Sequence, residues 1–185
     1  EGDIHIDVAF IAAPGADRRG NLNGVSGPSA CGTLGYAHAD AAYADIVVAI
    51  TDNLEEYPLC PMEINENQVD YVVLVDSIGN PKGIVSGTTQ ITKDPIGLKI
   101  AADTLKVLEA SGLLKNGLSF QTGAGGISLA VAKELELYMK EKQLVGSFAS
   151  GGITGYIVKM MEDGLFRALL DVQCFDLEAV RSYRE

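Results

Sequence analysis

The sequence has 185 residues, of which 47% are hydrophobic and only 6% aromatic, and it carries a formal charge of -11. This length can bury one good core, so one large domain or two small ones are possible. The acidic balance argues against partners such as nucleic acid or an anionic membrane surface, but it leaves anionic small substrates open, because backbone dipoles bind anions without Lys or Arg.

The cysteines favour a reducing compartment. Cys31, Cys60 and Cys174 are scattered, odd in number and without Cys-x-x-Cys spacing, which predicts a cytoplasmic location. No apolar run has membrane-spanning length and no signal peptide is recognisable. The chain starts without Met and stops inside an expected helix, so we expect a segment of a longer polypeptide.

The first half of the chain alternates apolar runs with polar connections. Residues 6–13 are continuously apolar, which is typical of a strand buried on both faces. A long loop rich in Gly, Asn and Ser is expected over 14–35, followed by a short helix over 37–44. Two further strands are expected over 45–50 and 69–75.

The second half has a regular alternation of strands and helices. After Asp94-Pro95, a helix is expected to continue to Gly112. Strands over 118–121 and 168–173 enclose a pattern of helix, strand and helix, and a last helix begins at Asp176. This β-α-β-α order predicts an α/β fold with a parallel sheet.

Two segments rich in glycine connect strands to helices in this half. The first glycine segment is residues 119–128, Ser-Phe-Gln-Thr-Gly-Ala-Gly-Gly-Ile-Ser, and the second is residues 147–155, Ser-Phe-Ala-Ser-Gly-Gly-Ile-Thr-Gly. Each is expected to place bare N–H groups and a helix N-terminus at the carboxyl end of a strand. Such a place suits a phosphate, a carboxylate or a developing oxyanion.

Three other interpretations of these segments can be weighed. Gly123, Gly125 and Ser128 only approximate a dinucleotide G-x-G-x-x-G, and the acidic residue expected roughly 20 positions later is missing from the end of the next strand. A serine hydrolase elbow is rejected, because no His follows Ser150. A tight strand-to-helix turn without any ligand remains open.

Outside these segments, the loop over 17–24 is either an Asx-rich turn or a pocket lining in which Arg18 and Arg19 hold a carboxylate. His5 and His38 have no second His or Cys at ligand spacing, so no metal site is expected.

The strings over 120–132, 146–155 and 169–179 resemble the alpha subunit of bacterial citrate lyase, a citrate:acyl-carrier-protein transferase of the CoA-transferase superfamily. Residues 7–17, followed by Gly20 and Asn21, are similar to the strand and Asp…Gly-Asn loop of the wider superfamily. The resemblance covers essentially the whole chain.

This resemblance implies a CoA-transferase-like fold of largely parallel sheets with flanking helices. Residues 1–95 would be the end of one CoA-transferase-like unit, and residues 118–185 would be the start of a second, related unit. Residues 96–117 would form a helix and linker that connect the two units. The family exchanges acetyl for citrate on an acyl-carrier-protein (gamma) subunit, giving the citryl thioester and acetate, and a lyase (beta) subunit then cleaves the product. The carrier bears a CoA-like prosthetic group, so no cofactor is expected on this chain itself. An oligomeric complex is expected.

The resemblance also implies a site. Many CoA-transferases have a nucleophilic glutamate in a Glu-Asn-Gly-Ile-x-Gly string, which aligns with residues 150–155 and puts Ser150 at the glutamate position. A glutamyl thioester is then impossible there, which implies direct attack by citrate in a ternary complex. Ser150, Gly151 and Gly152 are predicted to form the oxyanion and thioester loop.

Substrate contacts are predicted at seven further residues: Thr122, Gly123, Ala124, Gly125, Gly126, Asp17 and Asn21. The alternatives are a non-catalytic segment that binds the carrier or neighbouring subunits, and the same transfer with citramalate.

Overall fold

The computed structural model describes residues 4–84 and 89–184. By their internal contacts, the residues divide into two compact units, Glu1–Ile84 with Val180–Glu185, and Val85–Ala179. The helix expected to connect two units therefore falls inside the second one. That the two units are related CoA-transferase-like repeats stays a prediction.

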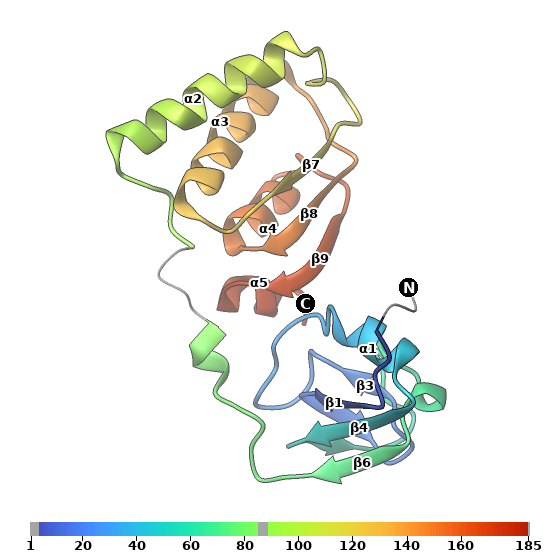
Figure 1. Ribbon diagram of the computed structural model, residues 1–185. Helices are drawn as coiled ribbons and strands as arrows, with labels where there is room; N and C mark the ends of the chain where they lie inside the picture. Colours follow the sequence, from blue (N-terminus) through green and yellow to red (C-terminus); the bar gives the residue numbers. More distant parts are fainter. Residues whose placement is uncertain (1–3, 85–88, 185) are drawn as a thin grey trace. The chain divides into compact units, whose positions relative to one another are not determined.

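The first unit is built on a parallel sheet of three strands in the order β1-β4-β6 (Figure 1). These are β1 (Val8–Ala12), β4 (Ile46–Thr51) and β6 (Tyr71–Leu74), all apolar and rich in β-branched residues. The helix α1 (Ala37–Tyr43) lies between β1 and β4 in the chain. One face of the sheet forms the core, with four buried strand residues packed with Leu22 and Ile64: Ala9, Ile11, Val47 and Ala49.

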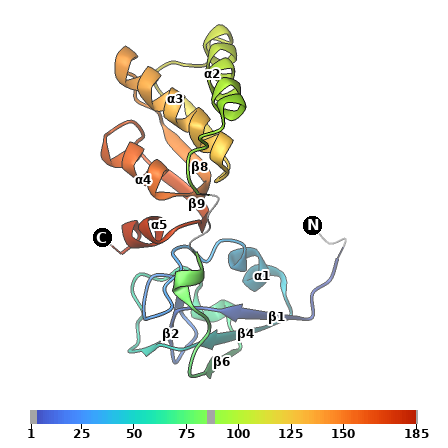
Figure 2. The same ribbon diagram turned by 90° about the vertical axis from the view of Figure 1, so that its left-hand side faces the viewer.

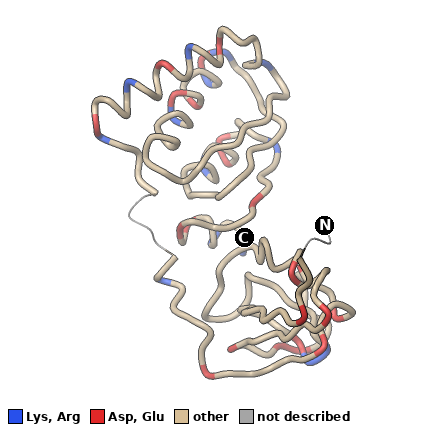
Figure 3. The backbone as a smooth tube through the Cα atoms, viewed as in Figure 1, with Lys and Arg blue, Asp and Glu red and all other residues tan. Residues whose placement is uncertain are grey.

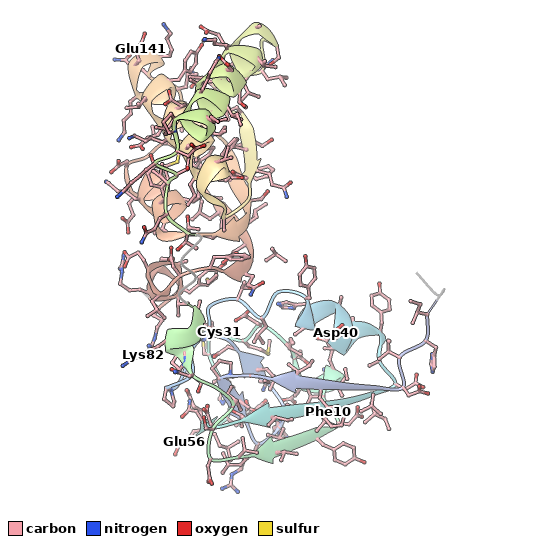
Figure 4. The ribbon with its side chains drawn as sticks, turned by 60° about the vertical axis from the view of Figure 1, so that its left-hand side comes forward. Phe10, Cys31, Asp40, Glu56, Lys82 and Glu141 are labelled. Carbon is pink, nitrogen blue, oxygen red and sulfur yellow. The ribbon has the colours of Figure 1, made fainter. Side chains whose placement is uncertain are left out.

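The other face of this sheet differs from expectation. β1 alternates exposed and buried residues, and Phe10, labelled in Figure 4, is 71% exposed. In the parallel register Phe10 lies beside Val48, which lies beside Tyr71, itself 61% exposed. The expectation of a strand buried on both faces is therefore wrong for the part of the chain that the structure describes.

The region expected to be one long loop holds short strands. β2 (Gly15–Asp17) pairs with β3 (Leu22–Asn23) and with β5 (Leu54–Glu55) in a second small sheet. The N–H of Leu22 also donates to the carbonyl of Ile64 at 2.9 Å. Two short 3-10 helices, η1 (Glu66–Gln68) and η2 (Pro81–Ile84), lie in the later connections.

The second unit confirms the predicted α/β alternation. Its parallel sheet has the order β7-β8-β9, formed by β7 (Ser119–Thr122), β8 (Phe148–Ile153) and β9 (Leu169–Cys174). The helices are α2 (Pro95–Ala110), α3 (Gly126–Lys142), α4 (Gly155–Glu162) and α5 (Leu177–Ser182). Among the described residues, no helix combines the length and apolarity needed to cross a membrane.

Helix α2 begins where the sequence indicates and packs along α3 (Figures 1 and 2). The Asp94 carboxylate accepts a hydrogen bond from the Gly97 N–H at 2.8 Å, and Pro95 occupies the first turn. On α3, the apolar periodicity predicts Leu135 correctly as buried, but Ile127, expected on the same inward face, is 43% exposed, and Leu129 and Met139 are buried instead.

Charged residues of both signs occur along α2 and α3 (Figure 3). One network ties α3 to α4: Lys140 contacts Glu136 at 2.6 Å and Asp163 at 2.9 Å, and Asp163 also contacts Lys159. The Tyr156 hydroxyl donates to Glu136. Lys140 lies in the last turn of α3 and Asp163 at the C-cap of α4, so this ion pair joins the two helices at the end of α4 that is far from β8.

Candidate functional site

The two glycine segments come together at one edge of the second sheet. β7 and β8 are neighbours in parallel register, and Thr122 pairs directly with Gly151. The carboxyl ends of parallel strands meet at the same edge, where ligands of open α/β sheets bind. Five predicted residues of the first segment and three of the second therefore share this edge: Thr122, Gly123, Ala124, Gly125, Gly126, Ser150, Gly151 and Gly152.

The first glycine segment forms a true turn from strand to helix. Thr122 ends β7, and its hydroxyl donates to the carbonyl of Ser128 at 3.2 Å, which closes the turn. Helix α3 starts at Gly126 with Gly125 as its N-cap residue in an extended conformation. Gly125 brings no side-chain acceptor, whereas Asp94 caps α2. The positive end of the 17-residue α3 dipole therefore lies at this bare turn.

The glycines of this turn differ in whether neighbouring atoms leave room for a side chain. A Cβ on Gly126 would lie 3.0 Å from the carbonyl oxygen of Gln90, so packing favours glycine there. A Cβ on Gly125, by contrast, would meet no described atom within 4 Å, and one on Gly123 would meet only Ser128 Oγ at 3.5 Å. Packing within the described chain thus leaves room for side chains at Gly123 and Gly125.

The second glycine segment is built differently from its prediction. Gly151 and Gly152 lie inside strand β8 and not in the following turn. Gly151 has φ +112°, and a Cβ there would lie 2.9 Å from the Thr122 carbonyl oxygen. A Cβ on Gly152 would lie 2.1 Å from the ring of Phe175. Both glycines are therefore required by the backbone and by packing. Ser150 is half-buried beside Gln121 and Leu170.

The N-terminus of α4, which follows this segment, is already in contact with a carboxylate of the chain itself. The Gly155 N–H donates to both carboxylate oxygens of Asp176, at 3.0 and 2.9 Å, and the Ala179 N–H donates to the same group. Among the described residues, the Thr154 hydroxyl is buried without a hydrogen-bond partner. The expectation that both segments offer a helix N-terminus to a ligand is therefore wrong for the second, because the chain's own carboxylate occupies it.

Asp171 is a residue at this sheet that sequence reasoning missed. It pairs with Gly151, and its carboxylate accepts hydrogen bonds from the Gln173 N–H at 2.8 Å and the Ile153 N–H at 3.3 Å. The Cys174 thiol donates to it at 3.0 Å. Burial raises the pKa of Asp171, and these hydrogen bonds offset only part of that shift. A lone carboxylate within the apolar run 168–172 was the signal that could have revealed it.

Asp17 and Asn21 lie in the first unit and are engaged with their own chain. Asp17 Oδ1 accepts from three backbone N–H groups of its turn, and Oδ2 accepts from Asn21 Nδ2 at 2.7 Å and from the Leu59 N–H at 3.0 Å. Burial alone would raise the pKa of Asp17, but the hydrogen bonds from Asn21, Leu59 and Arg19 lower it on balance. Asn21 also bonds Glu66 through both ends of its amide. This geometry supports the Asx-rich turn, and a substrate contact stays a prediction.

Sequence spacing left His5 without partners, but the fold brings two carboxylates to it. His5 Nε2 lies 3.0 Å from Asp45 and 3.7 Å from Asp7, and the three ligand atoms lie within 4.8 Å of one another. All three residues are exposed, and the hydrogen bond between His5 and Asp45 accounts for the group.

Comparison with solved structures defines the class of protein first. The 4-hydroxybutyrate CoA-transferase of Porphyromonas gingivalis shares the fold with a TM-score of 0.52 and 22% identity, over 90% of this chain and 36% of that one. The fold is thus the α/β type of the CoA-transferases.

A family model described as citrate lyase, alpha subunit (CitF), matches residues 1–185, and the chain belongs to this family. The citrate lyase alpha chain of Klebsiella pneumoniae is 48% identical over 181 residues. That match covers 98% of this chain and 36% of the relative, so the chain spans about a third of its length. A Streptococcus mutans protein described as the alpha subunit of citrate lyase, crystallised with citrate, has a TM-score of 0.92 and 50% identity over 98% of this chain and 36% of that one.

A substitution pair separates glycines that the backbone requires from those it does not. Gly151→Ala places a Cβ against the Thr122 carbonyl at a φ that L-residues disfavour, so we expect a loss of about 1–3 kcal/mol in the free energy of unfolding. Gly125→Ala, at φ -73°, should change stability by less than about 1 kcal/mol, because a gain of about 0.4–1 kcal/mol from the unfolded chain opposes the poorer N-cap residue. Urea unfolding of the full-length subunit measures both. Equal stability of the two variants would contradict the conclusion that the backbone requires glycine at position 151 but not at position 125.

A second substitution tests the Asp17 turn. Asp17→Asn replaces one accepting oxygen with an NH2 group and leaves at least two donors, such as Asn21 Nδ2 and the Leu59 N–H, without that acceptor, so the variant should lose about 2–4 kcal/mol at pH 7. The pKa of Asp17 in the folded chain is lowered from its ordinary value of 3.8. The ionised carboxylate therefore contributes its full stabilisation of the fold above pH 3.8, and this contribution is lost as the pH falls through the folded pKa. The gap between the wild type and the variant should therefore narrow below pH 3.8. Asp40→Asn, on the exposed side of α1, is the control and should show no gap.

Proposed function

We propose that this chain is part of a transferase subunit that exchanges acetyl for citrate on a carrier thioester. A citrate carboxylate attacks the acetyl thioester carbonyl, giving a mixed anhydride and releasing the carrier thiolate. The thiolate then attacks the citryl carbonyl of the anhydride, which forms the citryl thioester and frees acetate. Membership of the citrate lyase alpha family supports this reaction.

The observation that carries the proposal is the bare turn at Gly123 and Gly125. Carboxylate attack on a thioester builds negative charge on the carbonyl oxygen, which N–H donors at close range stabilise. Within the described chain, neither glycine is demanded by packing, and the N-cap of α3 has no side chain. Residues 116–132 also contain no Lys, Arg, Asp or Glu. This segment would therefore contribute backbone N–H groups to an oxyanion or carboxylate, and its glycines permit a close approach of the ligand to the backbone.

The residue at the position of the nucleophilic glutamate cannot form a glutamyl thioester. The resemblance places Ser150 where related CoA-transferases have a glutamate, and Ser150 is half-buried within β8. This supports a ternary complex in which the two substrates react with each other. Positioning of both substrates would then supply much of the rate enhancement.

The proposed partners follow from the reaction. The thioester would be carried by an acyl carrier subunit with a CoA-like prosthetic group, and a lyase subunit would consume the product. Apolar side chains such as Phe10, Tyr71 and Val107 are more than 60% exposed, which supports association with further protein surface in a complex.

The bare turn can be tested directly. In the full-length subunit with the acetylated carrier and citrate, Gly125→Ala should lower the rate of citryl-thioester formation by about 10²-fold, because a methyl group would enter the space proposed for the substrate. Gly83→Ala is the matched control, since a Cβ there also meets no described atom within 4 Å, and it should transfer at the wild-type rate. An unimpaired Gly125→Ala variant would remove the main support for the proposal, and absent transfer by the wild type would refute it.

Ser150 provides a test of the non-covalent mechanism. If its hydroxyl only donates a hydrogen bond, Ser150→Ala should slow transfer by ~10²–10³ at most, as for one oxyanion donor. Mass spectrometry of the wild-type subunit, quenched during turnover, should find Ser150 unmodified. A trapped seryl ester, with complete loss of transfer in the alanine variant, would show covalent catalysis instead.

A further inference from the structure

The strands β8 and β9 lose their regular pairing beside the second glycine segment. Gly151 pairs with Asp171, but the next pair is Gly152 with Gln173, so Val172 is an extra residue in β9. Such a bulge bends a strand and re-aims the groups next to it, and it is frequent beside active sites. Here it falls one strand away from Thr122, which is itself paired with Gly151.

The Asp171 side chain supplies the hydrogen bonds at this bulge. Its Oδ1 accepts from the N–H of Gln173, two residues along its own strand, and from the N–H of Ile153 on the facing strand. Its Oδ2 accepts from the Cys174 thiol, and Cys174 is buried. One carboxylate therefore bridges both strands at the point where the register shifts.

We propose that Asp171 is a positioning residue for the transfer site, because its carboxylate fixes the bulge and through it the backbone path of residues 151–153. The proposal rests on the proposed function and names a residue that acts on it from the neighbouring strand. Gly151 is in direct register with Thr122 on one side and Asp171 on the other. A shift of Gly151 would therefore be passed to the turn that begins at Thr122.

The apolar surroundings of Asp171 indicate that its carboxylate has a particular role at the bulge. Asp171 follows Leu169 and Leu170 in an otherwise apolar strand, where burial disfavours its charged form and raises its pKa. An apolar residue would avoid that cost but could not accept from two backbone donors on different strands.

Two variants separate hydrogen-bond geometry from charge. Asp171→Asn keeps an oxygen that can accept from the Ile153 and Gln173 N–H groups, and its NH2 can face Cys174 Sγ. Asp171→Ala removes both acceptors. Asp163→Ala is the control, since it removes a carboxylate of the same unit that bonds only lysines and no bulge backbone in the described residues.

In the full-length subunit with its carrier, Asp171→Ala should lower kcat by about 10- to 100-fold with an unchanged KM for citrate, as expected for misplaced reacting groups. Asp171→Asn and Asp163→Ala should stay close to the wild-type kcat. An unchanged kcat in Asp171→Ala, an effect on KM alone, or an Asp171→Asn variant as slow as the alanine variant would each overturn the proposal.

A readout without turnover distinguishes this proposal from failure of the proposed function. Deuterium exchange of a peptide over residues 148–155 should be faster in Asp171→Ala than in the wild type, and unchanged in Asp171→Asn and Asp163→Ala. If the wild type transfers no acyl group, the proposed function fails and the exchange result alone decides whether Asp171 holds the bulge. Equal exchange in all four proteins would overturn that assignment too.

Discussion

The parallel pairing of Thr122 with Gly151 is the constraint on which the arrangement of the second unit depends. It brings two segments that are separated along the chain to one edge of the sheet, and it brings the Thr122 carbonyl so close that a Cβ at position 151 would lie 2.9 Å away. The backbone at Gly151 responds with a φ of +112°, which only glycine adopts at low cost. The bulge beside Asp171 follows at the next strand.

The unit also shows where an acidic protein uses its own carboxylates. Asp94 accepts from the start of α2, Asp176 from the start of α4, and Asp171 from the bulge between β8 and β9. Helix α3 differs, because its N-cap residue is Gly125. In the first unit, Asp17 likewise accepts hydrogen bonds from its own chain, with five donors shared between its two carboxylate oxygens. Asp94 and Asp176 thus contact the starts of α2 and α4, whereas the N-cap residue of α3 offers no side chain that would compete with an external anion.

Much of the architecture could be predicted from sequence pattern. The Asp94-Pro95 start of α2 and the strand-helix alternation after residue 118 depend on local propensities and periodicity, which neighbouring residues alone determine. The burial of β1 could not be predicted, because an apolar run is the same whether one face or both are covered. The short strands β2 and β3 were missed because β2 also pairs with β5 and Leu22 of β3 also bridges to Ile64, and both partners lie more than thirty residues further on.

By itself, the sequence determined the fold class, the family and the presence of two glycine segments, since these depend on residue order and local periodicity. Only the tertiary structure decided that the two segments are not equivalent. Gly151 and Gly152 are required by the Thr122 carbonyl and the Phe175 ring, and Asp176 closes the helix end behind them. Gly123 and Gly125 meet no such neighbour among the described residues. The physical reason is that the need for a glycine depends on atoms brought close by strand pairing, and these are distant in sequence.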